Sequence, residues 1–267
     1  MSVASQHRTA PLEAGPPARA LEVLEASEQS QRPALRPAGA LLLWAGAGYL
    51  VCEAVTASAW TDPAHSYAAN FISDLGATDC STFQQRLVCS PLHTVMNTAF
   101  VVYGVLFALA GLLLVRAARA RAAHPGGPGR TPRSLLAAVL AHAVGIVLVG
   151  SFHGSTAATA DGTVAYHYAG ATLAILGGNA AVLLAGRQHR ALGLRRWFAT
   201  ASTALGVLGL AAVPVLIATS STPVAGVVER ICVDTIIGWD VMAGIALLLA
   251  PRWPVRLRTA RAAAGRA

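Results

Sequence analysis

Three histidines, His93, His153 and His167, lie at the ends of long apolar segments, where their rings are able to bind a metal ion. Three histidine ligands leave one position of a tetrahedral Zn²⁺ open for water, which is the arrangement of a catalytic zinc site. A water molecule on such a zinc ion gives up a proton near neutral pH. One hypothesis is therefore a metal-dependent membrane hydrolase that acts on an ester or amide of a lipid.

Carboxylates near the same ends of these segments supply the other part of that mechanism. Glu53, Asp74 and Asp234 are the candidates for a catalytic general base, and the two aspartates can also complete the metal-ligand set. The chain contains no HExxH or HxxxH pair, so a metal site would draw its ligands from several separate segments. The interpretation we favour is that these side chains pair with one another and fix helix packing. The residues do not by themselves identify an enzyme.

His142 and Asp240 are polar residues in the interior of two apolar segments, and their positions place both near the middle of a membrane. An ionisable residue at this depth costs about 2.5–3.5 kcal/mol to insert and usually faces protein instead of lipid. The similar depth of the two residues allows them to pair. Such a pair is either a buried structural hydrogen bond or a proton-transfer step in a transporter, which is a third class of function.

Cys80 and Cys89 lie in or beside the polar segment over residues 60–91. Disulfide bonds form and persist in oxidising compartments. We expect the two cysteines to form a disulfide bond that fixes the end of this segment. Connections as long as residues 60–91 usually carry function or pack as a lid.

The composition is that of a protein whose surroundings are lipid. Apolar residues make up 55% of the 267-residue chain and charged residues only 12%, with a mean hydropathy of +0.55. A helix that crosses the hydrocarbon core needs about 20 apolar residues and satisfies its own backbone hydrogen bonds. Such helices are predicted over residues 39–59, 92–115, 134–153, 165–185, 199–219 and 230–250. The predicted fold is therefore all-α, with six transmembrane helices.

The predicted membrane domain covers residues 37–251, with a polar tail on either side. Residues 1–36 mix acidic and basic side chains and contain no apolar core of a secretion signal, so we expect a disordered tail there. Residues 252–267 are expected to form a second tail, which is basic.

The distribution of arginine predicts the orientation in the membrane. All 20 basic residues are arginines, and most lie between the second and third, and the fourth and fifth, apolar segments or after the sixth. Short connections rich in arginine stay in the cytoplasm. We therefore expect a multi-pass protein of the cell membrane with both termini in the cytoplasm and residues 60–91 outside. Because the arginines cluster at segment ends instead of along one face, nucleic-acid binding is not expected.

Several stretches of the chain resemble one family of membrane proteins. They are NFISDLGATDC at 70–80, VCSPLHTVMNTAFVVYG at 88–104, and the longer segments at 149–184 and 226–249. They are similar to the uncharacterised prokaryotic membrane proteins grouped as domain of unknown function 998, which look distantly like the eukaryotic Frag1/DRAM proteins. The resemblance implies six helices. It implies no mechanism, because the family has no assigned activity.

The function favoured at this point is the binding or sensing of a lipid or small molecule by a polar pocket at the outer ends of the helices, or a structural role in the envelope. The alternatives are the metal-dependent hydrolase and the proton-coupled transporter. The expected partners are the lipid bilayer and a lipid or small-molecule ligand, and Zn²⁺ is the cofactor of the hydrolase alternative alone.

Overall fold

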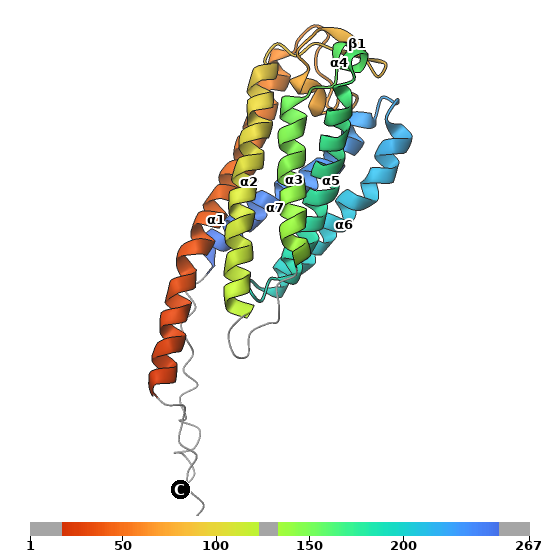
Figure 1. Cartoon of the computed structure of the whole chain (residues 1–267). Coiled ribbons are helices and arrows are strands. Elements are labelled where there is room, and N and C mark those ends of the chain that lie inside the picture. The colour runs from red at the N-terminus through yellow and green to blue at the C-terminus, as the bar shows by residue number, and fades with distance from the viewer. Residues whose placement is uncertain (1–17, 123–132, 251–267) are drawn as a thin grey trace, which may run out of the picture. The chain divides into compact units, whose positions relative to one another are not determined.

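Six long helices form the body of the protein (Figure 1). The computed structural model describes residues 18–122 and 133–250, with side chains from Leu35 onward. The long helices are α1 (Ala18–Ala59), α2 (His93–Ala122), α3 (Arg133–Ser151), α5 (Val164–Arg187), α6 (Arg196–Thr219) and α7 (Ala225–Leu249). Each of the six contains a stretch long and apolar enough to cross a membrane. The predicted all-α fold with six spans is confirmed.

The ends of the helices differ somewhat from the predicted ends. Helix α2 continues to Ala122, past the predicted residue 115, because an arginine-rich last turn is compatible with the negative end of a helix dipole. Helix α1 begins at Ala18, and its apolar span covers Leu35–Ala59. Residues 18–36 of the predicted disordered tail belong to helix α1 instead, which continues the helix of the first span. The predicted tail residues 1–17 and 252–267 lie outside the described residues, and the limits of the membrane domain at 37 and 251 stay a prediction.

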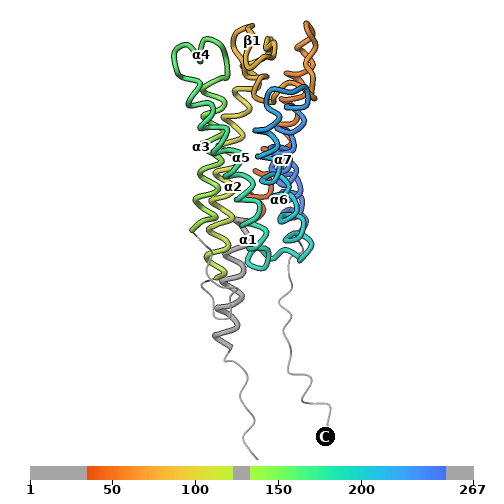
Figure 2. Tube along the Cα trace, turned by 90° about the vertical axis from the view of Figure 1, so that its right-hand side faces the viewer, coloured from red at the N-terminus to blue at the C-terminus, as the bar shows by residue number. Residues whose placement is uncertain are grey.

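The helices pack in chain order into a closed ring (Figures 1 and 2). Helix α2 packs on α3, α3 on α5, α5 on α6, and α6 on α7. The ring closes where Gly39 of α1 lies against Gly244 and Leu247 of α7. On the other side of α1, Tyr49 packs on Tyr103 of α2, with ring centroids 5.2 Å apart. Consecutive helices are thus neighbours, as expected for antiparallel helices with short connections.

Small residues set the closest contacts between these helices. A Cβ atom added at Gly104 of α2 would lie 2.9 Å from the carbonyl oxygen of Ala143 in α3. One added at Gly145 of α3 would lie 2.3 Å from the backbone nitrogen of Ala174 in α5. Small side chains allow helix backbones to approach closely in a membrane, where packing drives association. Helix α3 is therefore held against both of its neighbours by positions that need glycine.

A segment of short elements, residues 60–92, covers one end of the ring, and we call it the cap (Figure 2). It contains the 3₁₀ helix η1 (Ser73–Gly76) and the strands β1 (Ser81–Phe83) and β2 (Arg86–Val88), which pair antiparallel. The short helix α4 (Thr156–Asp161) lies beside β1 and joins α3 to α5. These short elements were not predicted, because they are too short to have a hydrophobic period.

Replacing Gly145 by alanine is expected to lower the free energy of unfolding by about 1–3 kcal/mol, since the new methyl group meets backbone atoms that cannot rotate away. Gly238→Ala is the matched control, because no atom lies within 4 Å of its added Cβ and alanine is the better helix former. Thermal unfolding of both variants in detergent measures the difference. Equal stability of the two variants would contradict the packing described.

Candidate functional site

The ion pair of Arg86 and Asp74 organises the cap. The guanidinium donates from Nε to Asp74 Oδ2 at 3.0 Å and from Nη2 to Asp74 Oδ1 at 3.2 Å. It also lies 3.9 Å from the ring centre of Phe71 and donates to the carbonyl oxygen of Ser220, between α6 and α7, at 3.3 Å. The Asp74 side chain is only 2% exposed, so its charge depends on Arg86 for compensation.

A second ion pair, Arg230 with Glu53, joins α7, α1 and the cap. Arg230 Nη2 donates to Glu53 Oε1 at 3.0 Å. Its Nη1 donates to the carbonyl oxygens of Tyr67 at 3.0 Å and Asn70 at 2.9 Å, both in the cap. The guanidinium also lies 4.6 Å from the centre of the Tyr67 ring. One cation therefore neutralises a carboxylate of α1 and fixes the backbone of the cap.

The cap packs against the first turns of α7. The carboxylate of Glu229 accepts a hydrogen bond from the backbone N–H of Ile72. One turn earlier, Gly226 allows the cap backbone to come close, because a Cβ there would lie 2.3 Å from the carbonyl oxygen of Asn70. Neither contact was predicted from the sequence. The acidic and basic residues at this end of α7 indicated only that ion pairs could form there.

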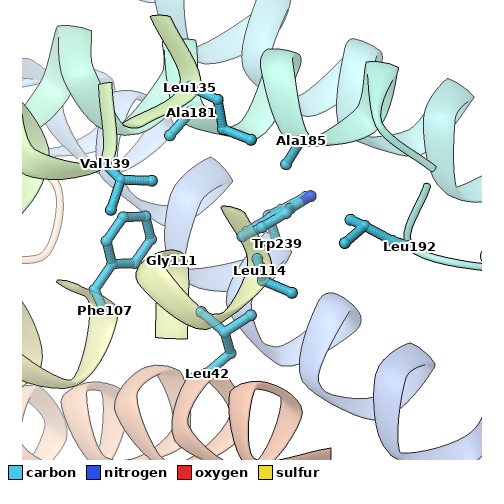
Figure 3. Close-up of a pocket in the computed structure, with 10 residues that line it drawn as sticks. All are labelled: Leu42, Phe107, Gly111, Leu114, Leu135, Val139, Ala181, Ala185, Leu192 and Trp239. Atoms are coloured by element: carbon cyan, nitrogen blue, oxygen red, sulfur yellow. The ribbon is translucent and has the colours of Figure 1, made fainter. Parts of the chain in front are cut away.

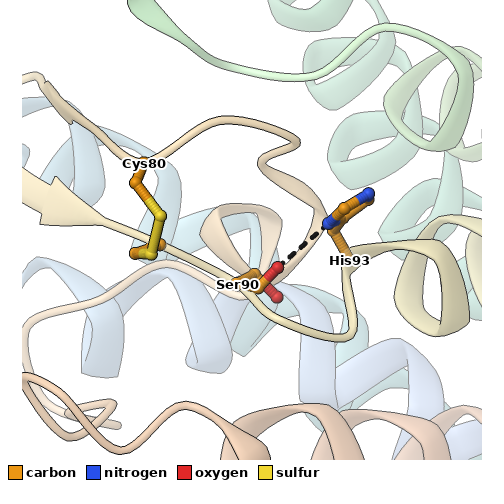
Figure 4. The surroundings of a disulfide bond; sticks show 4 residues. Cys80, Ser90 and His93 are labelled. Carbon is orange, nitrogen blue, oxygen red and sulfur yellow. Dashed lines mark hydrogen bonds between the residues drawn. A yellow bond between two sulfur atoms is a disulfide. The ribbon is translucent and has the colours of Figure 1, made fainter.

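The predicted disulfide bond between Cys80 and Cys89 is present beside the cap hairpin (Figure 4). Next to it, Ser90 Oγ donates to the carbonyl oxygen of Leu75 at 2.7 Å. The His93 Nδ1 atom lies 3.0 Å from the carbonyl oxygen of Ser90, the contact drawn in Figure 4. The disulfide and these two bonds hold the end of the cap against the first turn of α2.

The structure brings two of the three candidate metal ligands together. His93 and His153 line one open groove of about 410 Å³ beside α2 and the end of α3. Desolvation, and then the nearby His93 ring, lowers the pKa of His153. His167 is buried instead, with Nδ1 2.8 Å from the carbonyl oxygen of Phe152. The described residues contain no group of three or more His, Cys, Asp or Glu side chains placed to hold a metal ion, so the zinc site stays a prediction.

Two of the three candidate catalytic carboxylates are in ion pairs with arginines, and the third is not. Asp74 is paired with Arg86, and Glu53 is paired with Arg230. Asp234 differs from them, because its side chain is exposed and forms no hydrogen bond or ion pair with any residue in the described ranges. It faces an open groove between α6 and α7, immediately below the cap.

This α6–α7 groove has a volume of about 600 Å³, within the usual range for small-molecule sites. Most of its walls are apolar side chains of α6 and α7, and cap residues form its rim. It is lined by Tyr67, Ala68, Leu205, Leu208, Val227, Arg230, Ile231, Asp234 and Thr235. The charge of Arg230 is compensated by Glu53, so the groove carries the negative charge of Asp234.

His142 and Asp240 are linked through Tyr103 instead of by the direct pairing that was predicted. The Tyr103 hydroxyl lies 2.7 Å from Asp240 Oδ2 and 3.2 Å from His142 Nε2. The Nδ1 atom of His142 lies 2.7 Å from the carbonyl oxygen of Ala174. All three side chains are buried. The sequence feature that could have indicated this link is a tyrosine in the middle of an apolar span, because a buried phenol needs a hydrogen-bond partner.

The fold and these contacts define a polytopic membrane protein of six helices with an ion-paired cap over one end. The family model described as protein of unknown function (DUF998) matches residues 43–246, and the chain belongs to this family. No curated protein and no solved structure matches the chain. The resemblance noted in the sequence is thereby confirmed for this family, and the more distant likeness to Frag1/DRAM proteins stays a prediction.

Replacing Arg86 by methionine is expected to lower the free energy of unfolding by about 3–5 kcal/mol, because Asp74 is left buried without a partner. Adding Asp74→Asn to this variant removes the orphaned charge and is expected to restore part of the loss. Chemical denaturation of the three proteins in detergent measures the effect. If Arg86→Met alone is as stable as the wild type, the ion pair does not hold the cap in place.

A histidine without a polar partner lies inside the cap. The ring of His65 sits between Trp60 and Tyr67, with centroid distances of 5.3 and 5.0 Å. Neither ring nitrogen has a hydrogen-bond partner among the described residues. Burial, and then the charge of Arg230, lowers the pKa of His65 to about 4. The ring is therefore neutral when the cap is closed at neutral pH.

The stability of the wild type relative to His65→Phe is expected to fall as the pH drops from about 6.5 to about 4. In this window the unfolded chain binds a proton at His65 and the folded chain does not. Above and below this pH window, the difference in stability between the two proteins is constant. Partial exposure of the His65 ring to water makes the pH effect smaller. Unfolding of both proteins over a pH series measures it, and a difference independent of pH would contradict the assignment.

Proposed function

We propose that this protein binds an amphipathic lipid in the α6–α7 groove, with the headgroup on Asp234 and an acyl chain along the apolar wall of α6. The observation that carries the proposal is the free carboxylate of Asp234 in an open groove. Ionisable residues within membrane spans are costly and usually have a partner or a function. Since Asp234 has no partner among the described residues, its partner is expected to come from outside the chain.

Charge complementarity selects the chemistry of the headgroup. The arginine of the groove is engaged with Glu53, so Asp234 favours a positively charged group. A primary ammonium carries that charge and donates three hydrogen bonds to acceptors such as a carboxylate. A quaternary ammonium has no hydrogen to donate, and an anionic headgroup is repelled. A lipid with a primary amine in its headgroup therefore fits the groove best.

The depth of Asp234 supports a ligand that enters from the level of the cap. Asp234 lies one helical turn below Arg230 and about 13 Å along the axis from the start of α7 at Ala225. Tyr67 forms the rim above it. The arginine distribution predicts that the cap faces the outside of the cell, and we propose that the groove opens to the outer leaflet of the cell membrane.

Native mass spectrometry of the full-length protein with added phosphatidylethanolamine, phosphatidylcholine and phosphatidylglycerol tests this proposal. We expect phosphatidylethanolamine to bind most tightly, and Asp234→Asn to weaken its binding about tenfold, equivalent to about 1.4 kcal/mol. Asp161→Asn is the matched control, because Asp161 is an exposed acid of α4 outside the groove.

A second variant tests the apolar wall. Leu208→Trp fills the groove and is expected to weaken the binding of every lipid, without changing the order among headgroups. Equal binding of the three lipids to the wild type, or unchanged phosphatidylethanolamine binding in Asp234→Asn, would overturn the proposal.

A further inference from the structure

We infer that Asp240, Tyr103 and His142 form a buried site that binds one exchangeable proton at the centre of the helix ring. The inference is independent of the lipid groove and concerns three side chains from α7, α2 and α3. It rests on the number of hydrogens that the observed contacts need.

The contacts of His142 fix the position of one of its hydrogens. The Nδ1 atom lies 2.7 Å from the carbonyl oxygen of Ala174, which can only accept, so Nδ1 carries a hydrogen. In a neutral ring Nε2 is then an acceptor. Its neighbour is the Tyr103 hydroxyl, at 3.2 Å.

Tyr103 has one hydroxyl hydrogen but two close neighbours. The second neighbour is Asp240 Oδ2, at 2.7 Å. If His142 is neutral and Asp240 is ionised, both neighbours are acceptors, and one of the two contacts has no hydrogen between its atoms. An unmade hydrogen bond at a buried polar group costs about 1–3 kcal/mol.

One added proton completes both contacts. When the proton is on Asp240, the carboxyl group donates to Tyr103 and Tyr103 donates to His142. When it is on His142, the imidazolium donates to Tyr103 and Tyr103 donates to Asp240. The two arrangements interconvert by the shift of one hydrogen in each bond, and no bond between heavy atoms changes.

The surroundings of Asp240 also favour a bound proton. The residue is 0% exposed, and its Oδ1 atom has no hydrogen-bond partner among the described residues. Among the described residues, Arg86 pairs with Asp74 and Arg230 pairs with Glu53. Neither arginine therefore compensates the charge of Asp240. A buried carboxylate without such a partner is strongly disfavoured, and a proton makes the three-residue site neutral.

Few other titratable groups face the site. Tyr49 of α1 packs on Tyr103. Helices α5 and α6 contribute neutral polar side chains nearby, Asn179 and Ser202, each hydrogen-bonded to a residue of α7. On α7 itself, the nearest acid toward the cap is Asp234, which faces the outer groove. The proton is therefore shared by the three residues of the site.

Tyr103 is the member of the site that borders a groove. Tyr103 lines, together with Tyr49 and Thr98, a groove of about 410 Å³ between α1 and α2. Toward the end away from the cap, the packing is apolar, and a cavity of about 20 Å³ there is lined by apolar side chains such as Phe107 and Trp239 (Figure 3). Apolar cavities of this kind stay dry. This cavity therefore supplies no water to the site from that end.

Infrared spectroscopy and histidine ¹⁵N NMR of the full-length protein locate this proton. In the wild type at neutral pH we expect either a protonated carboxyl band that disappears in Asp240→Asn, or a doubly protonated His142 that becomes neutral in Asp240→Asn. In this variant the amide donates to Tyr103 and Tyr103 to His142, so every contact is made without the extra proton. Asp161→Asn is the control and leaves both signals unchanged.

Tyr103→Phe removes the bridging hydroxyl and is expected to melt at a clearly lower temperature than Asp240→Asn, which should melt within a few degrees of the wild type. If Tyr103→Phe does not fold, the comparison of wild type with Asp240→Asn decides the question alone. A wild-type protein with a neutral His142 and no carboxyl band sensitive to Asp240→Asn would overturn the inference.

Discussion

Burial of charge at one end of the helix ring depends on two arginine–carboxylate ion pairs, and the position of the cap follows from them. Arg86 compensates Asp74 within the cap, and Arg230 compensates Glu53 while binding cap carbonyl groups. Removing a charge from water costs several kcal/mol unless its partner is in place. Arg230 thereby joins the cap to both α1 and α7, which couples the position of the cap to the packing of these two helices.

Three carboxylates of α7, Glu229, Asp234 and Asp240, form no ion pair among the described residues. Glu229 accepts a hydrogen bond from the cap, whereas Asp234 and Asp240 differ in their surroundings. Asp234 faces an open groove, so a ligand from the membrane can reach it. Asp240 is fully buried against Tyr103, and we infer that a proton compensates its charge there. The same helix therefore places one acid in an open groove and buries the other.

Glycine positions make the central site possible. A Cβ added at Gly178 of α5 would lie 2.5 Å from His142 Nδ1, so only glycine leaves room for the imidazole ring. The close contact of α3 with α5 at Gly145 brings the carbonyl oxygen of Ala174 within reach of that ring. Backbone packing thus fixes which nitrogen of His142 carries a hydrogen, and this hydrogen determines the proton count of the site.

The sequence by itself determined the six spans, because a membrane helix satisfies its own backbone and needs only a local apolar stretch. It also predicted the disulfide, whose cysteines are close in the chain. Only the tertiary structure decided the partners: Tyr103 between His142 and Asp240, an arginine for each buried acid of the cap and α1, and a shared groove for His93 and His153 with His167 buried. The physical reason is that side-chain partners depend on how each helix is rotated and packed, which hydropathy does not encode.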